Sequence, residues 1–248
     1  MNKTPVLFLP GTLCTPAVFE QQIGELAQHT PRIDALRFTL QNSIAEMADL
    51  AIAHIPHRSG AAIVGFSMGG MVAMEIARKA PELVRKLALL NTNCQANQPD
   101  RQSARIMHLE QARLKGIGSV IKQYYLQHYL YKPHTKARDL IIKMACELGT
   151  ECFEAQIEAL ATRPDLTPSL AGIKCPTLIL GATEDRLCPP ETQTLMHRQI
   201  ENSELVMLEA CGHFSTLEQP EVVSDKLIKW YQATAVPPNL TLPGYKRD

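Results

Sequence analysis

A serine lies between two glycines in the stretch GFSMG at residues 65–69. An apolar run over residues 61–66 precedes it and a helical pattern over Gly69 to Lys79 follows, so Ser67 falls at a strand-to-helix turn. Glycines on both sides let a strand and a helix pass closely while the turn holds the serine in a strained conformation. This context predicts that Ser67 is a nucleophile, the alternative being an ordinary turn of small residues.

A serine hydroxyl is a weak nucleophile without a base, and this motif calls for an acid and then a histidine further along the chain. Asp185 follows the apolar run Thr177 to Leu180, and His213 follows the run Leu205 to Leu208. The three groups therefore leave three strand ends, which meet at one edge of a parallel sheet. His213 is predicted to take the proton of Ser67, while Asp185 orients the imidazole and stabilises its charged form.

Other residues compete for these two roles. Glu184 is a rival acid, although we expect it to be a solvated loop residue. His213 is one of 8 histidines and, taken alone, could be an ordinary loop histidine. We favour it because it follows a strand and a Cys-Gly turn at the expected point in the chain order.

Acyl transfer also needs hydrogen-bond donors for the oxyanion, usually backbone N–H groups. One donor is predicted at Met68, directly after the nucleophile, and the second in the loop after the first strand. In that loop Thr12 is our preferred donor and Leu13 the alternative. A plain Pro-Gly turn at residues 10–11 is the simpler interpretation.

The elements that must position these groups alternate between apolar runs and helical patterns, which is typical of α/β proteins with a mostly parallel sheet of about six strands. The expected strands are Val6 to Leu9, Ile33 to Phe38, Ala61 to Phe66, Leu87 to Asn91, Thr177 to Leu180 and Leu205 to Leu208. The expected helices of the core are Phe19 to Ala27, Ile44 to Ile55, Gly69 to Lys79, Pro190 to Gln199 and Pro220 to Tyr231.

Residues 92–176 contain no convincing strand and show helical patterns instead, which predicts an inserted helical cap. The expected division is a core of residues 1–93 and 172–235, a cap of residues 94–171 and a C-terminal tail of residues 236–248. The expected cap helices are Ser103 to Leu114, Gly118 to Leu130, Thr135 to Leu148 and Glu151 to Thr162.

The cap should decide which substrate is bound. Residues 101–143 hold nine Lys and Arg against two acidic residues, an excess of seven positive charges. The simpler interpretation of this excess is that the charges lie on solvated helical faces. The more specific interpretation is that they attract an acidic carrier protein, a coenzyme A ester or a carboxylated substrate. Tyr124 and Tyr125, together with Leu13, are candidates for the substrate pocket. Tyr129 and Tyr131 belong to the same stripe and could also line it, although tyrosines in such a stripe more often form lid core.

The composition narrows the function further. Lys and Arg (25) balance Asp and Glu (25), so the chain has no net positive charge of the kind that binds nucleic acid or an anionic membrane surface. No apolar run approaches the roughly 20 residues that span a bilayer, and a signal-peptide core is not evident, so we expect a cytoplasmic protein. The 7 cysteines lack metal-site spacing and indicate packed thiols, so we expect neither metal nor cofactor.

These motifs together resemble the α/β-hydrolase fold superfamily, in its small esterase branch with a helical lid, similar to carrier-protein methyl ester esterases. The resemblance covers residues 1–91 and 172–232. It rests on PGT at 10–12, GFSMGG at 65–70, the Asp185 loop with Pro189 four residues on, and CGHFSTLEQPE at 211–221. The position of Pro189 favours Asp185 over Glu184. Many members have His-Gly where this chain has Pro10-Gly11, and an opening antiparallel hairpin is expected to be absent.

The resemblance implies a serine hydrolase that cleaves a carboxylic ester or thioester of small to medium acyl chain through an acyl-enzyme. The substrate would be a small molecule or an ester bound to an acyl carrier. The same three residues also occur in lyases, synthases and carbon–carbon bond hydrolases, which is the alternative. A non-catalytic binding protein fits least well, because all three groups are present.

Overall fold

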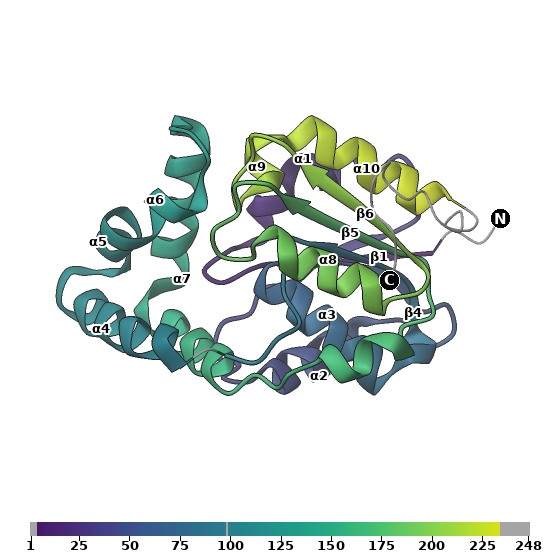
Figure 1. The fold of residues 1–248 in the computed structure, drawn as a ribbon, viewed down its shortest axis with the longest axis horizontal. Helices are drawn as coiled ribbons and strands as arrows, with labels where there is room; N and C mark the ends of the chain where they lie inside the picture. The colour runs from purple at the N-terminus through teal and green to yellow at the C-terminus, as the bar shows by residue number, and fades with distance from the viewer. Residues whose placement is uncertain (1–3, 98, 234–248) are drawn as a thin grey trace.

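The computed structural model describes residues 4–97 and 99–233. Its centre is a six-stranded parallel sheet with the order β2-β1-β3-β4-β5-β6, which confirms the predicted α/β class (Figure 1). The strands are β1 (Val6–Leu9), β2 (Ile33–Ala35), β3 (Ala61–Phe66), β4 (Val84–Leu90), β5 (Thr177–Ala182) and β6 (Ser203–Leu208).

Helices cover both faces of this sheet, which explains why its central strands read as unbroken apolar runs. Ile63 on one face packs in a cluster with residues of α2, α3 and α8, whereas Val64 on the other face packs in a cluster with residues of α1 and α10. The helices of these layers are α1 (Glu20–Leu26), α2 (Ile44–His54), α3 (Met68–Lys79), α8 (Pro190–Gln199) and α10 (Pro220–Gln232). Shorter turns are η1 (Pro16–Phe19), η2 (Pro81–Leu83), η4 (Thr167–Gly172) and α9 (Ser215–Glu218).

The edge strand β2 ends three residues earlier than the expected Phe38. In the described sheet β2 pairs with β1 alone. The last backbone hydrogen bond between these two segments runs from the Leu36 N–H to the Phe8 carbonyl oxygen at 3.0 Å. Further along β1 the next residues are Leu9 and Pro10, and a proline has no N–H to donate to a neighbouring strand. The partner strand therefore cannot extend, and the apolar residues after Ala35 pack without strand pairing.

The segment between β4 and β5 forms helices that lie together at one end of the molecule, beside the sheet (Figure 1). The expected break between two cap helices falls at Gly149, whose φ of 82° interrupts the helical path of α7. The bounds 94–171 for a cap stay a prediction, and the predicted tail at 236–248 lies outside the described residues. These helices are α4 (Pro99–Lys115), α5 (Ile117–Val120), the π-helix η3 (Ile121–Tyr125), α6 (Leu126–Tyr129) and α7 (Thr135–Ala161).

In the described part of the chain, every helix is too short or too polar to cross a membrane.

Candidate active site

The turn between β3 and α3 holds Ser67 in an uncommon backbone conformation, with φ 53° and ψ −118°. Such a positive φ is strained for a residue with a side chain. A Cβ added to Gly65 would lie 2.4 Å from the Gly69 carbonyl oxygen, and one added to Gly69 would lie 2.0 Å from the Leu9 carbonyl oxygen. Both glycines are therefore required by the close passage of backbone segments around the serine.

The structure brings Ser67, Asp185 and His213 together in one hydrogen-bonded chain. His213 Nε2 lies 2.9 Å from Ser67 Oγ, and His213 Nδ1 lies 2.8 Å from Asp185 Oδ2. An ionised carboxylate can only accept hydrogen bonds, so Nδ1 carries the ring proton and Nε2 is left to accept from the serine hydroxyl. This is the tautomer that a general base for Ser67 requires.

The carboxylate of Asp185 is buried, and four donors hold it. Oδ1 accepts from the N–H groups of Leu187 and Cys188, both at 2.9 Å, while Oδ2 accepts from His213 and from Asn91 Nδ2 at 3.0 Å. Burial acts to raise the pKa of Asp185, but the electrostatic interaction with His213 and the hydrogen bonds from His213, Cys188 and Asn91 outweigh it and hold the pKa below its usual value. The rival Glu184 is exposed.

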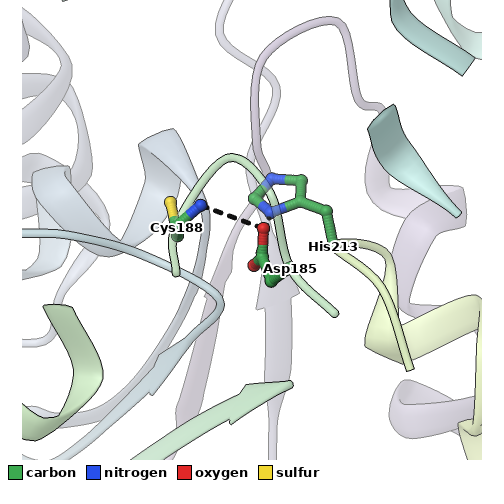
Figure 2. Close-up of side chains that lie close together, drawn as sticks. All are labelled: Asp185, Cys188 and His213. Atoms are coloured by element: carbon green, nitrogen blue, oxygen red, sulfur yellow. Dashed lines mark hydrogen bonds and ion pairs between the residues drawn. The ribbon is translucent and has the colours of Figure 1, made fainter. Parts of the chain in front are cut away.

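Asp185, Cys188 and His213 present ligand-type atoms within 4.8 Å of one another (Figure 2). Figure 2 shows the Cys188 backbone N–H directed at the Asp185 carboxylate, with the His213 ring above that carboxylate in this view. Hydrogen bonds to the carboxylate therefore account for the close approach of the three residues.

Asn91 is a site residue that the sequence analysis missed. It directly follows β4, has φ 45°, and is fully buried. Its side-chain Nδ2 donates to Asp185, and its side-chain Oδ1 accepts from Ser215 Oγ at 2.5 Å. The available signal was position: a polar residue directly after a strand adjacent to β3 lies at the sheet edge where Ser67 lies.

Replacing Asn91 by glycine is expected to raise the pKa of Asp185 toward its usual value, because the carboxylate loses one donor. A lowered carboxyl pKa adds stability above the unfolded-state pKa, and that stability is lost as the pH falls through the folded-state pKa. The variant should therefore unfold at a higher pH on acidification, and should lose about 1.5–3 kcal/mol at pH 7. Glycine keeps the positive φ accessible.

Urea denaturation from pH 7 down to pH 3 measures both effects. The control is Asn202→Gly, which removes a surface amide bonded to the Lys174 carbonyl oxygen. An acid transition of Asn91→Gly that coincides with that of the wild type would contradict the role assigned to this amide.

The loop that carries His213 is fixed by Glu218. Its carboxylate accepts from the Gly212 N–H at 3.0 Å and from the Tyr131 N–H at 2.8 Å, and the His213 N–H donates to the Tyr129 carbonyl oxygen at 2.8 Å. Burial raises the pKa of Glu218 above its usual value, and the two N–H donors partly offset this. The backbone of residues 129–131, in the segment between β4 and β5, is thus hydrogen-bonded directly to the loop that carries His213 and to Glu218.

The two preferred oxyanion donors lie beside Ser67. Thr12 lines the pocket at the serine, and Met68 begins the 12-residue helix α3. Within the described chain, neither backbone N–H has a hydrogen-bond partner. The alternative donor Leu13 is engaged elsewhere, because its N–H donates to Gln156 Oε1 at 2.7 Å. Leu13 also falls outside the described pocket lining.

Gln156 joins the helical segment to the oxyanion loop. This buried side chain of α7 accepts from the Leu13 N–H and donates through Nε2 to the Phe38 carbonyl oxygen at 2.9 Å. Leu13 itself has a positive φ of 54°, so an external bond helps to hold the loop in this conformation. Gln156 is therefore placed to fix the direction of the neighbouring Thr12 N–H.

Replacing Gln156 by leucine should lower kcat for ester hydrolysis about tenfold with a smaller change in KM, because the Thr12 N–H, the predicted oxyanion donor, is no longer held in place. The buried Leu13 N–H loses its partner, and the Phe38 carbonyl oxygen keeps only the Cys152 thiol as a donor, at 3.4 Å. This should cost about 1–3 kcal/mol of stability. The control is Gln22→Leu, which removes another fully buried glutamine whose amide binds the Thr216 and Pro220 carbonyl oxygens. Steady-state kinetics and urea denaturation separate the two effects. A wild-type kcat in Gln156→Leu would contradict this role.

A pocket of about 100 Å³ opens on Ser67 and His213. Tyr125 lines it as predicted, whereas Tyr124 is outside the described lining and stacks on His108 at a centroid distance of 4.5 Å. Tyr129, another tyrosine of the expected stripe, also lines the pocket. Arg105 and Arg163 were not predicted as lining residues, because helical periodicity does not show which side of a cap helix faces the core. The remaining described lining residues are Thr12, Phe66, Met71, Asn93, Phe153, Ile157, Leu160, Leu187, Cys188 and Phe214.

The sequence of this chain is similar to those of known hydrolases. A family model described as the alpha/beta hydrolase family matches residues 6–226. The chain is 30% identical over 190 residues to a pimeloyl-[acyl-carrier protein] methyl ester esterase of Neisseria meningitidis serogroup B, which covers 72% of this chain and 70% of that protein. It is also 30% identical to a putative carbamate hydrolase RutD of Pseudomonas savastanoi pv. phaseolicola, over 63% of this chain and 62% of that relative.

A solved structure supports the same relationship. A thermophilic esterase from Thermogutta terrifontis, described with malate bound, matches with a TM-score of 0.82 at 26% identity and covers 92% of this chain and 89% of that one. These findings confirm the predicted resemblance and the predicted fold, and the relatives are hydrolases and esterases.

Proposed function

Because the chain belongs to the alpha/beta hydrolase family, we propose that it is a serine hydrolase that cleaves a carboxylic ester or thioester through an acyl-enzyme on Ser67. The observation that carries this proposal is the continuous hydrogen-bonded chain from Ser67 Oγ through the His213 ring to Asp185. Each member is held by further contacts, so the arrangement is ready before substrate binds. Ser67, His213 and Asp185 are the proposed catalytic residues.

In the acylation step, Ser67 Oγ attacks the carbonyl carbon while its proton moves to His213 Nε2. The carbonyl oxygen becomes an oxyanion, which accepts hydrogen bonds from the backbone N–H groups of Thr12 and Met68. The positive N-terminal end of α3 adds favourable electrostatics at the same position. Collapse of this intermediate breaks the bond to the leaving group, which takes the proton from His213 and departs as alcohol or thiol.

Deacylation repeats these steps with water as the nucleophile. His213 takes a proton from the water as it attacks the acyl carbon, and the same two N–H groups hold the second oxyanion. Ser67 then leaves as the hydroxyl, with the proton returned from His213, and a carboxylic acid is released. Asp185 remains ionised throughout and stabilises the imidazolium form of His213.

The pocket supports a small acyl group. Its volume of about 100 Å³ is below the range of roughly 300–1,000 Å³ common for sites that hold drug-sized ligands. We propose a small-molecule ester as substrate. An ester on an acyl carrier is the second form, supported by the positive excess over residues 101–143 and by the Neisseria relative's activity toward a carrier-bound methyl ester.

A fluorophosphonate probe and p-nitrophenyl esters from acetate to decanoate test the proposal. We expect one label per chain, a burst of p-nitrophenol, and the highest kcat/KM for the shorter acyl chains. Ser67→Ala should not label, while the surface control Ser119→Ala should label normally. Labelling without turnover of any ester or thioester would instead favour the lyase alternative.

A further inference from the structure

Two arginines line the pocket, and both come from the segment between β4 and β5. Arg105 lies on α4, and its Nη1 donates to Asn97 Oδ1 at 2.7 Å. Arg163 follows α7 and is only 7% exposed. The nucleophile, in contrast, lies on the sheet side of the same pocket. A substrate that reaches both sides would meet Ser67 with one end and guanidinium groups with another.

Backbone contacts fix the orientation of Arg163. Its Nε, Nη1 and Nη2 donate to the carbonyl oxygens of Gln95, Leu160 and Ala96 at 2.9, 3.0 and 3.3 Å. A guanidinium keeps its charge at any physiological pH and offers five donors in a rigid plane. A guanidinium held in this way places a fixed positive charge on the pocket wall, and a carboxylate is an anion that pairs well with it.

A buried tyrosine adds a neutral donor to this part of the pocket. Tyr129 is 7% exposed and lines the cavity, and its hydroxyl makes no hydrogen bond to another residue of the described chain. Burial raises its pKa well above the usual value, so the hydroxyl keeps its proton. The charge of Arg105 opposes that increase in pKa at both Tyr129 and Tyr125, and all three residues line the same cavity.

From this placement we propose that the pocket selects an ester that carries a carboxylate, which Arg105 and Arg163 bind with Tyr129 as an additional donor. The apolar wall that includes Phe153, Ile157 and Leu160 holds the short carbon chain between the carboxylate and the ester. This inference rests on the proposed role of Ser67 for turnover, although binding of the carboxylate does not require it.

Binding to the Ser67→Ala protein tests the anion site without chemistry. Isothermal titration calorimetry compares monomethyl succinate with methyl butyrate, a neutral ester of similar length. We expect the carboxylate ester to bind at least about tenfold more tightly, and Arg105→Gln in the same background to remove most of that difference. Equal affinities for the two esters would overturn the proposal, whatever the protein hydrolyses.

Turnover by the wild type then locates the carboxylate within the substrate. Methanol release compares kcat/KM for monomethyl succinate with that for methyl butyrate, which tests an acyl-side carboxylate. Acetate release compares acetoxyacetate with ethyl acetate, which tests the alcohol side. A kcat/KM about ten or more times higher for the carboxylate ester in either pair supports the proposal and shows whether the carboxylate belongs to the acyl or the alcohol part. Ratios near one in both pairs contradict the proposal.

Three variants assign the selectivity to residues. Arg105→Gln should lower the favoured ratio about tenfold, and Arg163→Lys should lower it less, because the positive charge remains while the planar guanidinium and its fixed position are lost. The matched control is Arg113→Gln on the same helix, whose exposed side chain pairs with Glu154 at 2.6 Å, and which should leave the ratio unchanged. Ratios that do not respond to Arg105→Gln would contradict the site. If the wild type neither hydrolyses these esters nor reacts with fluorophosphonate, the hydrolase proposal fails, while calorimetry still decides the anion site.

Discussion

Replacement of Ser67 by alanine is expected to lower kcat for ester hydrolysis roughly 10⁴- to 10⁶-fold. The hydroxyl oxygen at 2.9 Å from His213 Nε2 is the atom that attacks in the proposed mechanism, and alanine offers no substitute. The residual rate would come from the oxyanion donors and from substrate binding. Stopped-flow and steady-state assays with p-nitrophenyl acetate measure the loss.

The same variant should fold normally, which separates chemistry from stability. Alanine retains a Cβ and therefore retains the strained φ of 53° at this turn. Glycine at position 67 relieves that strain and should raise stability by about 1 kcal/mol while removing activity equally. Turnover by Ser67→Ala above one hundredth of the wild-type rate would contradict the nucleophile assignment.

The largest expected loss of stability belongs to Gly69→Ala. The added Cβ would lie 2.0 Å from the Leu9 carbonyl oxygen and 2.5 Å from the Leu9 carbonyl carbon, which belong to a fully buried central strand. Backbone of this kind cannot rotate away as a flexible side chain can. We expect a loss of about 3 kcal/mol or more, which for a chain of this size lowers Tm by roughly 6–12 °C.

A matched glycine provides the control for that experiment. Gly24 lies on the exposed part of α1, and a Cβ added there would meet nothing within 4 Å. Gly24→Ala should raise stability by about 0.5–1 kcal/mol, since alanine is the better helix former. Calorimetric Tm values for both variants test the pair. Equal Tm shifts would show that steric crowding does not require a glycine at position 69.

The approach of Ser67, Asp185 and His213 to one another was predictable because local pattern and chain order determine it. The run before Ser67, the helix after it, and the later strand ends at Asp185 and His213 are properties of sequence periodicity. A parallel sheet then brings strand ends to one edge without any further information. The end of β2 was not predicted, since it depends on Pro10, which directly follows the neighbouring strand β1.

The pocket was less predictable, because it depends on packing between the helical segment and the core. Tyr125 lines the pocket and Tyr124 does not, although they are adjacent in a stretch where a π-helix shifts the side-chain directions. Arg105 and Arg163 are 58 positions apart in the sequence, and only the path of α4 to α7 brings both to one cavity. No periodic signal in either segment marks them as neighbours.

The central claim is that substrate is held covalently on Ser67 during turnover, and rapid-quench mass spectrometry tests it most directly. The wild type is mixed with excess p-nitrophenyl acetate, quenched in acid during the burst, and analysed as intact protein and as peptides. The account predicts one acetyl group per chain, located on Ser67, which disappears as substrate is exhausted. An acetyl group on another residue, or continued turnover with no adduct on Ser67, would contradict it.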